Sequence, residues 1–188
     1  LARAETRRLA LLGLLLITPV PTISVLLMLF ASAGLPGKAG ALVCKLYLVL
    51  LPLVWTIKVD RQRPRVAKPP LRGMIAGAIS GVVIFAVMLG AYQLLRDGID
   101  LEPLRAKARE TGFAGLWMYL GIFVYIITVN SLLEEYVWRW FVVRQLETAL
   151  GDARWRAPAA VLGSAALFTV HHVFALAAWV DWRFNALA

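Results

Sequence analysis

The sequence predicts an all-α protein, a polytopic transmembrane helical bundle with about five spans. Hydrophobic residues make up 61% of the 188 residues, against about 45–50% in a typical soluble domain. Charged residues make up only 16%, and the mean hydropathy is +0.74. Several runs of about 20 residues carry no charge, which is the length that crosses the roughly 30 Å hydrocarbon core. These runs are continuous and do not alternate with period two, so the pattern does not favour a β-barrel.

The first expected span runs from Leu9 to about Phe30, after three arginines near the N-terminus. A secretory signal peptide is the rival interpretation, because Ala31-Ser-Ala33 resembles a cleavage site. Its apolar region would be about 22 residues long, against a usual 7–15, so we expect a retained span. Pro19 and Pro21 lack a backbone donor and predict a kink.

The second span is expected from Ala39 to Ile57, after a turn at Leu35-Pro-Gly37. Lys45 is expected near its outer end, where a lysine side chain can snorkel to the membrane interface. Residues 58–72 hold six basic residues, one acidic residue and three prolines. That composition predicts a surface loop.

The third span is expected from Met74 to about Leu95. Gly73, Gly77 and Gly81 recur every four residues, so one helix face is small enough for close packing. We expect this face to pack against another helix of the same chain, and dimerisation through it is the alternative.

The remaining chain predicts two further spans. A polar connection covers residues 96–110, the fourth element runs from Phe113 to Val143, and the fifth from Pro158 to about Val180. By the positive-inside rule, the N-terminus and the basic loop 58–72 face the cytoplasm, so we expect a multi-pass protein of the cell membrane.

Residues 1–188 are treated as a single integral membrane domain. The sequence begins without Met and ends without a polar tail, so we expect it to be truncated at both ends. Its net charge of +9 lies in short loops beside the spans, which suits anionic lipids and does not indicate nucleic-acid binding. Cys44 is the one cysteine, so no disulfide is expected.

Three charged residues interrupt the fourth apolar run: Glu134, Glu135 and Arg139. A charge at the centre of a membrane helix costs roughly 2.5–3.5 kcal/mol on insertion scales, so such residues usually mark function. Glu135 and Arg139 lie four residues apart and can form a neutralising pair along the helix. An alternative is that this pair only fixes the helix register.

Glu134 shares its stripe of the helix with Asn130 and has no cationic partner there, so it is the candidate general base. On the next helix His172 shares a face with Ser164 and Phe168, and His171 lies on the adjoining face. A Glu and a His on neighbouring helices can hold and activate a water molecule. Adjacent residues diverge by about 100° on a helix, so we expect one of the two histidines to be structural.

Other catalytic motifs are not present. The consecutive histidines do not match the His-Glu-x-x-His pattern of a zinc protease. The sequence also contains no Gly-rich phosphate loop and no Gly-x-Ser-x-Gly nucleophile turn.

Two motifs resemble those of the CAAX-protease and bacteriocin-processing (CPBP) family of intramembrane endopeptidases, which is related to type II CAAX prenyl endopeptidases. Glu134-Glu135-Tyr-Val-Trp-Arg139 is similar to the first family motif, Glu-Glu-x-x-x-Arg. Phe168-Thr-Val-His-His172 is similar to the second, Phe-x-x-x-His, one helix later. The resemblance covers a motif-bearing core at 113–180.

The resemblance implies a membrane-embedded protease that hydrolyses a peptide bond in a membrane-associated peptide or lipid-modified protein. Glutamate-type and metal-assisted mechanisms both stay open, so no cofactor is assigned and a divalent metal is possible. We predict catalytic roles for Glu134, His172, Glu135 and Arg139 and substrate-binding roles for Asn130, Phe168 and His171; no metal ligand is assigned.

Two features of the sequence leave alternatives open. No histidine follows His172, so the third family motif, His-x-x-x-Asn, is expected beyond Ala188; an inactive relative is the alternative. Measured from the midpoints of their expected spans, Glu134 and His172 differ in depth by roughly 13 Å, which helix tilt reduces. The competing functions are a proton-coupled transporter or channel component and a catalytically inactive scaffold or immunity protein.

Overall fold

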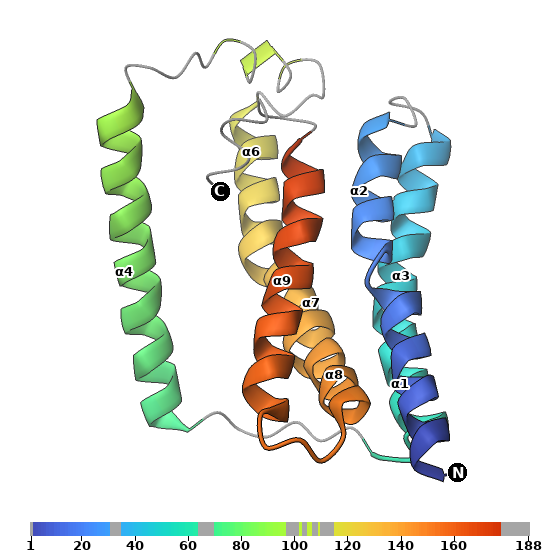
Figure 1. Ribbon diagram of the computed structural model, residues 1–188. Coiled ribbons are helices and arrows are strands. Elements are labelled where there is room, and N and C mark those ends of the chain that lie inside the picture. Colours follow the sequence, from blue (N-terminus) through green and yellow to red (C-terminus); the bar gives the residue numbers. More distant parts are fainter. Residues whose placement is uncertain are drawn as a thin grey trace.

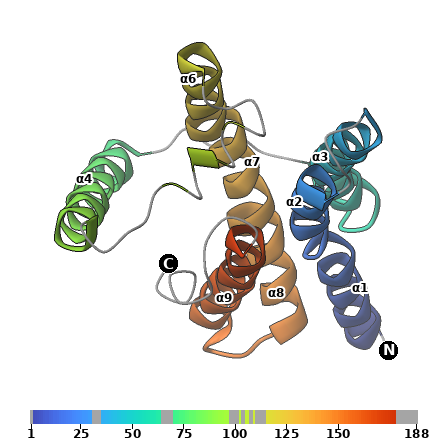
Figure 2. The ribbon, with the colours of Figure 1, turned by 90° about the horizontal axis from the view of Figure 1, so that it is seen from above.

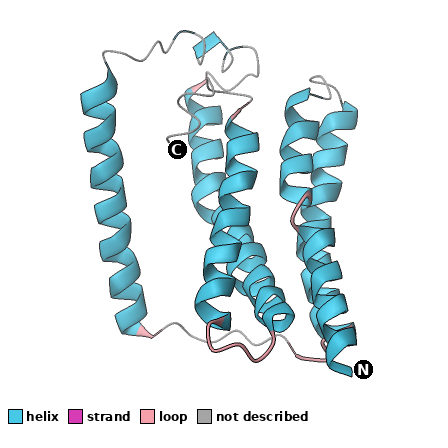
Figure 3. Cartoon of the chain, viewed as in Figure 1, coloured by secondary structure: helices cyan, strands magenta, loops and turns pink. Residues whose placement is uncertain are grey.

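The computed structural model describes residues 2–30, 35–63, 70–96, 102, 105–106, 109 and 115–177. This part of the chain is helical and contains no strand (Figure 3). The helices and π-helical segments (η) are α1 (Ala2–Ile17), α2 (Val20–Phe30), α3 (Leu35–Lys58), α4 (Leu71–Leu95), α6 (Leu116–Tyr125), η2 (Ile126–Asn130), α7 (Ser131–Glu134), η3 (Glu135–Val142), α8 (Val143–Leu150) and α9 (Arg156–Leu176). Five stretches among them are long and apolar enough to cross a membrane, which confirms the predicted polytopic all-α bundle.

The first span is broken where its prolines predict a kink. α1 ends at Ile17 and α2 begins at Val20, so the break falls at Thr18 and Pro19. The two helices together form the span Ala4–Leu27. A proline inside a helix removes one backbone donor and its ring clashes with the preceding turn, which accounts for the break.

The predicted turn at Leu35-Pro-Gly37 is wrong, because α3 already begins at Leu35. Pro36 then occupies the first turn of the helix, where its missing N–H would have no intrahelical partner in any case. The helix is therefore about one turn longer than expected at its N-terminal end. This places Lys45 close to the middle of α3, and its expected snorkelling to a membrane interface stays a prediction.

The fourth element, expected to end at Val143, continues to Leu150 and is one continuous 35-residue helical stretch from Leu116. It contains two π-helical segments, η2 and η3, which flank Glu134. Such segments are rare and occur often at functional sites. The last helix is described to Leu176, so the predicted end at Val180 lies outside the described residues, as does most of the 96–110 connection.

The core lies where the first three helices meet the long element. α1 contacts α8, α3 contacts η3, and α9 packs against η3 and α8 (Figures 1 and 2). The fully buried side chains at this junction include Ile17 of α1 and Val137, Phe141 and Val142 of η3. The N-terminal helices and the motif-bearing core therefore contribute to one cluster of buried apolar side chains.

Helix α4 stands apart from the other helices in both views (Figures 1 and 2). It buries no residue, and a Cβ added at Gly77 or Gly81 would meet no atom within 4 Å. The expectation that the glycine face packs within the chain is therefore wrong for the described residues. The helix itself is as predicted, since it depends on length and apolar composition and not on a partner.

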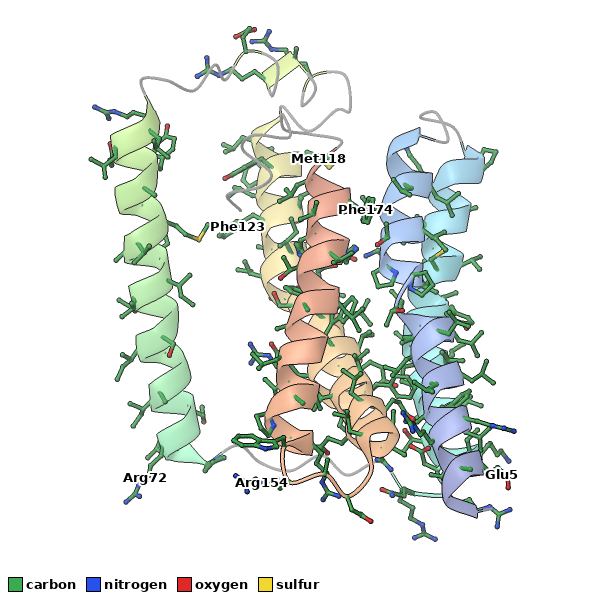
Figure 4. The ribbon with its side chains drawn as sticks, viewed as in Figure 1. Glu5, Arg72, Met118, Phe123, Arg154 and Phe174 are labelled. Atoms are coloured by element: carbon green, nitrogen blue, oxygen red, sulfur yellow. The ribbon has the colours of Figure 1, made fainter. Side chains whose placement is uncertain are left out.

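The positions of the helix ends agree with the predicted order in which the spans cross the membrane. Glu5, Arg72 and Arg154 lie at one end of the bundle, and Met118 and Phe174 lie in its other half (Figure 4). The start of α1, the end of α3, the start of α4 and the loop before α9 therefore share one side (Figures 1 and 4). That this side is cytoplasmic stays a prediction.

Gly13 tests the packing of α1 on α3. A Cβ at this position would come within 3.1 Å and 3.2 Å of two ring atoms of Trp55, which is buried. We expect Gly13→Leu to lower the stability of the purified protein by about 1–3 kcal/mol, because overpacking forces side chains out of their preferred rotamers. Thermal unfolding in detergent micelles measures the change. Gly77→Leu, which adds the same side chain in open space, is the matched control, and an equal loss in both variants would contradict this packing.

Candidate functional site

A cavity of about 200 Å³ lies between the N-terminal helices and the motif-bearing core. Its wall combines Pro21, Ser24 and Val25 of α2, Lys45 and Leu48 of α3, Asn130, Leu133, Glu134, Val137 and Trp138 of the long element, and His171, His172 and Ala175 of α9. Glu134 and His172 thus meet in one cavity. Both residues line this cavity, so the depth difference expected from the span midpoints does not keep them apart.

Glu134 is partly buried and is held by the amide of Asn130. The Asn130 Nδ2 donates to the Glu134 Oε1 over 2.7 Å, as the four-residue spacing predicts. No arginine or lysine of the described residues forms an ion pair with Glu134 within 4.0 Å. The Oε1 is oriented by Asn130, and the Oε2 is left to accept a hydrogen bond from a molecule in the cavity.

The orientation of His172 follows from its contact with the preceding turn of α9. Its Nδ1 lies 3.0 Å from the carbonyl oxygen of Phe168. A carbonyl oxygen accepts but cannot donate, so the Nδ1 carries the proton and the Nε2 of the neutral ring is an acceptor. The Phe168 ring also lies against the imidazole, with 4.1 Å between centroids. His172 therefore has one nitrogen fixed by its own helix and the other available for chemistry.

His171 is anchored in the cavity wall. It is buried, and its Nδ1 lies 3.0 Å from the hydroxyl of Thr22 on α2. Its ring stacks on Trp138, with 6.1 Å between centroids. Of the two histidines it is the one tied into the packing, and its predicted role in substrate binding stays a prediction.

Trp138 connects the two motif-bearing helices. Its ring meets Phe168 edge to face at a centroid distance of 5.7 Å. Its carbonyl oxygen accepts a 2.8 Å hydrogen bond from the buried hydroxyl of Ser164. Ser164, which shares a face with His172, thus links the two helices through this hydrogen bond. It is not a nucleophile in an exposed turn.

Glu135 and Arg139 form the predicted pair. The Arg139 Nε lies 3.2 Å from the Glu135 Oε1, and the two side chains are 79% and 54% exposed for Arg139 and Glu135, respectively. The pair therefore lies on an open face of η3 and is not enclosed by other helices. It lines a second cavity of about 470 Å³, whose apolar wall includes Val161, Ala165 and Phe168 of α9. Glu134 and Trp138 border both cavities.

Sequence reasoning missed the contribution of the N-terminal helices to this site. Ser24 is bonded to the carbonyl of Ala41 over 3.3 Å, and Lys45 lines the first cavity. Neither residue belongs to the two motifs. The one available signal was Lys45 itself, a charge inside a membrane span, which is by default a functional candidate.

The described residues contain no group of three or more His, Cys, Asp or Glu side chains that could hold a metal ion. A catalytic zinc site generally uses three protein ligands. The described side chains in the cavity therefore do not by themselves fit a metal centre.

Comparison with known proteins bears on the motif-bearing part of the chain. The family model described as "Type II CAAX prenyl endopeptidase Rce1-like" matches residues 116–188. The match begins at the first residue of α6 and includes both motifs, which confirms the resemblance found in the sequence. No curated protein and no solved structure matches the chain.

The Glu135–Arg139 pair yields a test of charge balance in the membrane. Glu135→Gln leaves an arginine without its partner, whereas the double variant Glu135→Gln/Arg139→Gln removes both charges. We expect the single variant to lose about 1 kcal/mol of stability or more, since an unpaired arginine in a span is costly, and the double variant to lose less. Thermal unfolding in lipid nanodiscs measures both. Equal losses would show that the pair does not offset its charges.

Proposed function

We propose that the chain, with its confirmed resemblance to type II CAAX prenyl endopeptidases, is an intramembrane endopeptidase. It hydrolyses a peptide bond in a membrane-associated peptide or a prenylated protein. The observation that carries the proposal is that Glu134 and His172, from two different helices, line one cavity. Each has one atom held by a neighbour, Asn130 or Phe168, and another able to accept a hydrogen bond.

In the proposed reaction a water molecule lies between the Glu134 carboxylate and the Nε2 of His172. Glu134 accepts a proton from this water as the oxygen attacks the carbonyl carbon of the substrate. His172 accepts the second hydrogen bond of the water and orients it. The proton on Glu134 then passes to the amide nitrogen as the carbon–nitrogen bond breaks, which releases an amine and a carboxylic acid.

The neighbouring residues have supporting roles in this proposal. Asn130 holds the Glu134 carboxylate in one orientation, which a general base needs to meet its substrate in a fixed geometry. Glu135 and Arg139 balance each other's charge beside the second cavity. Phe168 borders that cavity together with apolar side chains of α9, a surface that suits the hydrophobic part of a membrane-bound substrate. His171 contributes to the wall of the first cavity.

The proposal predicts that Glu134→Gln and His172→Ala each lower kcat by at least about 100-fold, since general acid–base catalysis contributes typically 10²–10⁴-fold. The assay is cleavage of a fluorogenic prenylated peptide by the purified chain in proteoliposomes. Glu147→Gln is the matched control for the carboxylate, because Glu147 lies in α8 on the same helical element and lines neither cavity.

Size-exclusion profiles and unfolding temperatures show whether each variant is folded. Full cleavage by folded Glu134→Gln or His172→Ala protein would refute the proposed mechanism. Proton flux across the same liposomes, with no cleavage of any peptide, would instead support the transporter interpretation.

A further inference from the structure

Lys45 is a charged residue near the middle of a membrane span, and neither motif explains it. It belongs to α3, outside the segment that the family model matches. Its side chain is half-buried and lines the cavity that also contains Glu134 and His172. The Nζ lies 5.0 Å from the ring centroid of Tyr125, the last residue of α6, which is a cation–π contact.

No carboxylate of the described residues pairs with Lys45 within 4.0 Å. It is also the one lysine or arginine among the residues that line this cavity. Glu134, the acidic residue in the same wall, is bonded to Asn130 instead. Charged side chains inside spans normally pair with an opposite charge or mark a ligand path. Lys45 thus lines the cavity with its ammonium over an aromatic ring and without a carboxylate partner among the described residues, so it has capacity to bind an anion.

Two kinds of anion could bind this ammonium: the oxygen of the reacting carbonyl group, or an anionic group elsewhere on the substrate. The location of the ammonium distinguishes between them. Tyr125 precedes Glu134 by nine residues on one continuous helical element, which is at most roughly 13 Å along the axis. A donor to the reacting carbonyl oxygen has to come within about 3 Å of it. An ammonium held over the Tyr125 ring is displaced from the Glu134 carboxylate along the helix. This displacement favours an anionic group of the substrate over the oxygen at the reacting centre.

We propose that Lys45 binds the free C-terminal carboxylate of the peptide substrate. This inference rests on the proposed function, because a CAAX sequence is by definition the C-terminal end of its protein. An extended peptide advances about 3.3–3.6 Å per residue, so a gap of at most roughly 13 Å corresponds to no more than about four residues. A carboxylate at Lys45 therefore places a bond a few residues upstream beside Glu134 and His172.

The inference makes Lys45 a specificity-determining residue, and the test is a comparison of two peptides. One prenylated CAAX peptide ends in a free acid and the other in an amide. Wild-type protein is expected to prefer the acid by about tenfold in kcat/KM, the effect of one charge-assisted contact. Lys45→Met keeps the length of the side chain but removes the charge, and it is expected to cleave the two peptides equally. Lys38→Met is the matched control, because Lys38 is exposed and lies about two helical turns before Lys45 in α3. This variant should keep the preference for the acid peptide.

A binding measurement separates this inference from the proposed function. The affinities of fluorescent acid and amide peptides are measured on Glu134→Gln protein and on Glu134→Gln/Lys45→Met protein in detergent micelles. A preference for the acid of about tenfold that disappears with Lys45 supports the inference. An equal affinity for both peptides on Glu134→Gln protein, or a preference that persists in the double variant, would overturn it. If wild-type protein cleaves neither peptide, the proposed endopeptidase activity fails, and the binding comparison still decides the role of Lys45.

Discussion

The packing of Trp138 is the contact on which the arrangement of the site depends. This side chain is 4% exposed; its ring touches Phe168 and His171, and its backbone carbonyl accepts the hydroxyl of Ser164. All three partners belong to α9. Glu134 lies one helical turn before Trp138, so the same packing sets the distance between the carboxylate and the histidines. In a bilayer, where lipid tails are as apolar as the side chains, such close packing and interhelical hydrogen bonds hold helices together.

The π-helical segments add a local reason for the geometry. η3 begins directly after Glu134 and brings Val137, Trp138, Phe141 and Val142 into the core together. A π-helical turn contains more residues than an α-helical turn, so the faces that precede and follow it no longer align. Glu135 and Arg139 consequently point to an open face while Trp138 is buried. Adjacent residues diverge by about 100° on a helix, so the two glutamates of the motif reach different surroundings: Glu134 borders both cavities, whereas Glu135 borders the second.

Charge in the membrane is the second organising constraint. The charged residues near the cavities are stabilised in three ways. Glu135 and Arg139 form an ion pair, Glu134 accepts a hydrogen bond from an amide, and the Lys45 ammonium lies over an aromatic ring. Two of these residues, Glu134 and Lys45, form no ion pair with a described residue within 4.0 Å. In a medium of low dielectric such groups are costly unless a ligand or water compensates them. The combination of an oriented carboxylate, a histidine acceptor and a lysine in one cavity is therefore consistent with a binding site for a polar, anionic group.

The helical class, the five spans, the proline break and the two neighbouring pairs Asn130–Glu134 and Glu135–Arg139 were predictable from the residues alone, because they depend on composition and on spacing within one helix. The contacts between helices were not predictable in this way and became visible in the folded chain. Lys45 lines the cavity because α3 packs beside the motif-bearing element, and His171 is anchored because Thr22 of a distant helix faces it. The glycine stripe of α4 shows the converse limit: a small face permits close packing but does not specify a partner. Contacts between helices depend on depth, rotation and π-helical turns, and none of these is encoded in the local pattern of a single span.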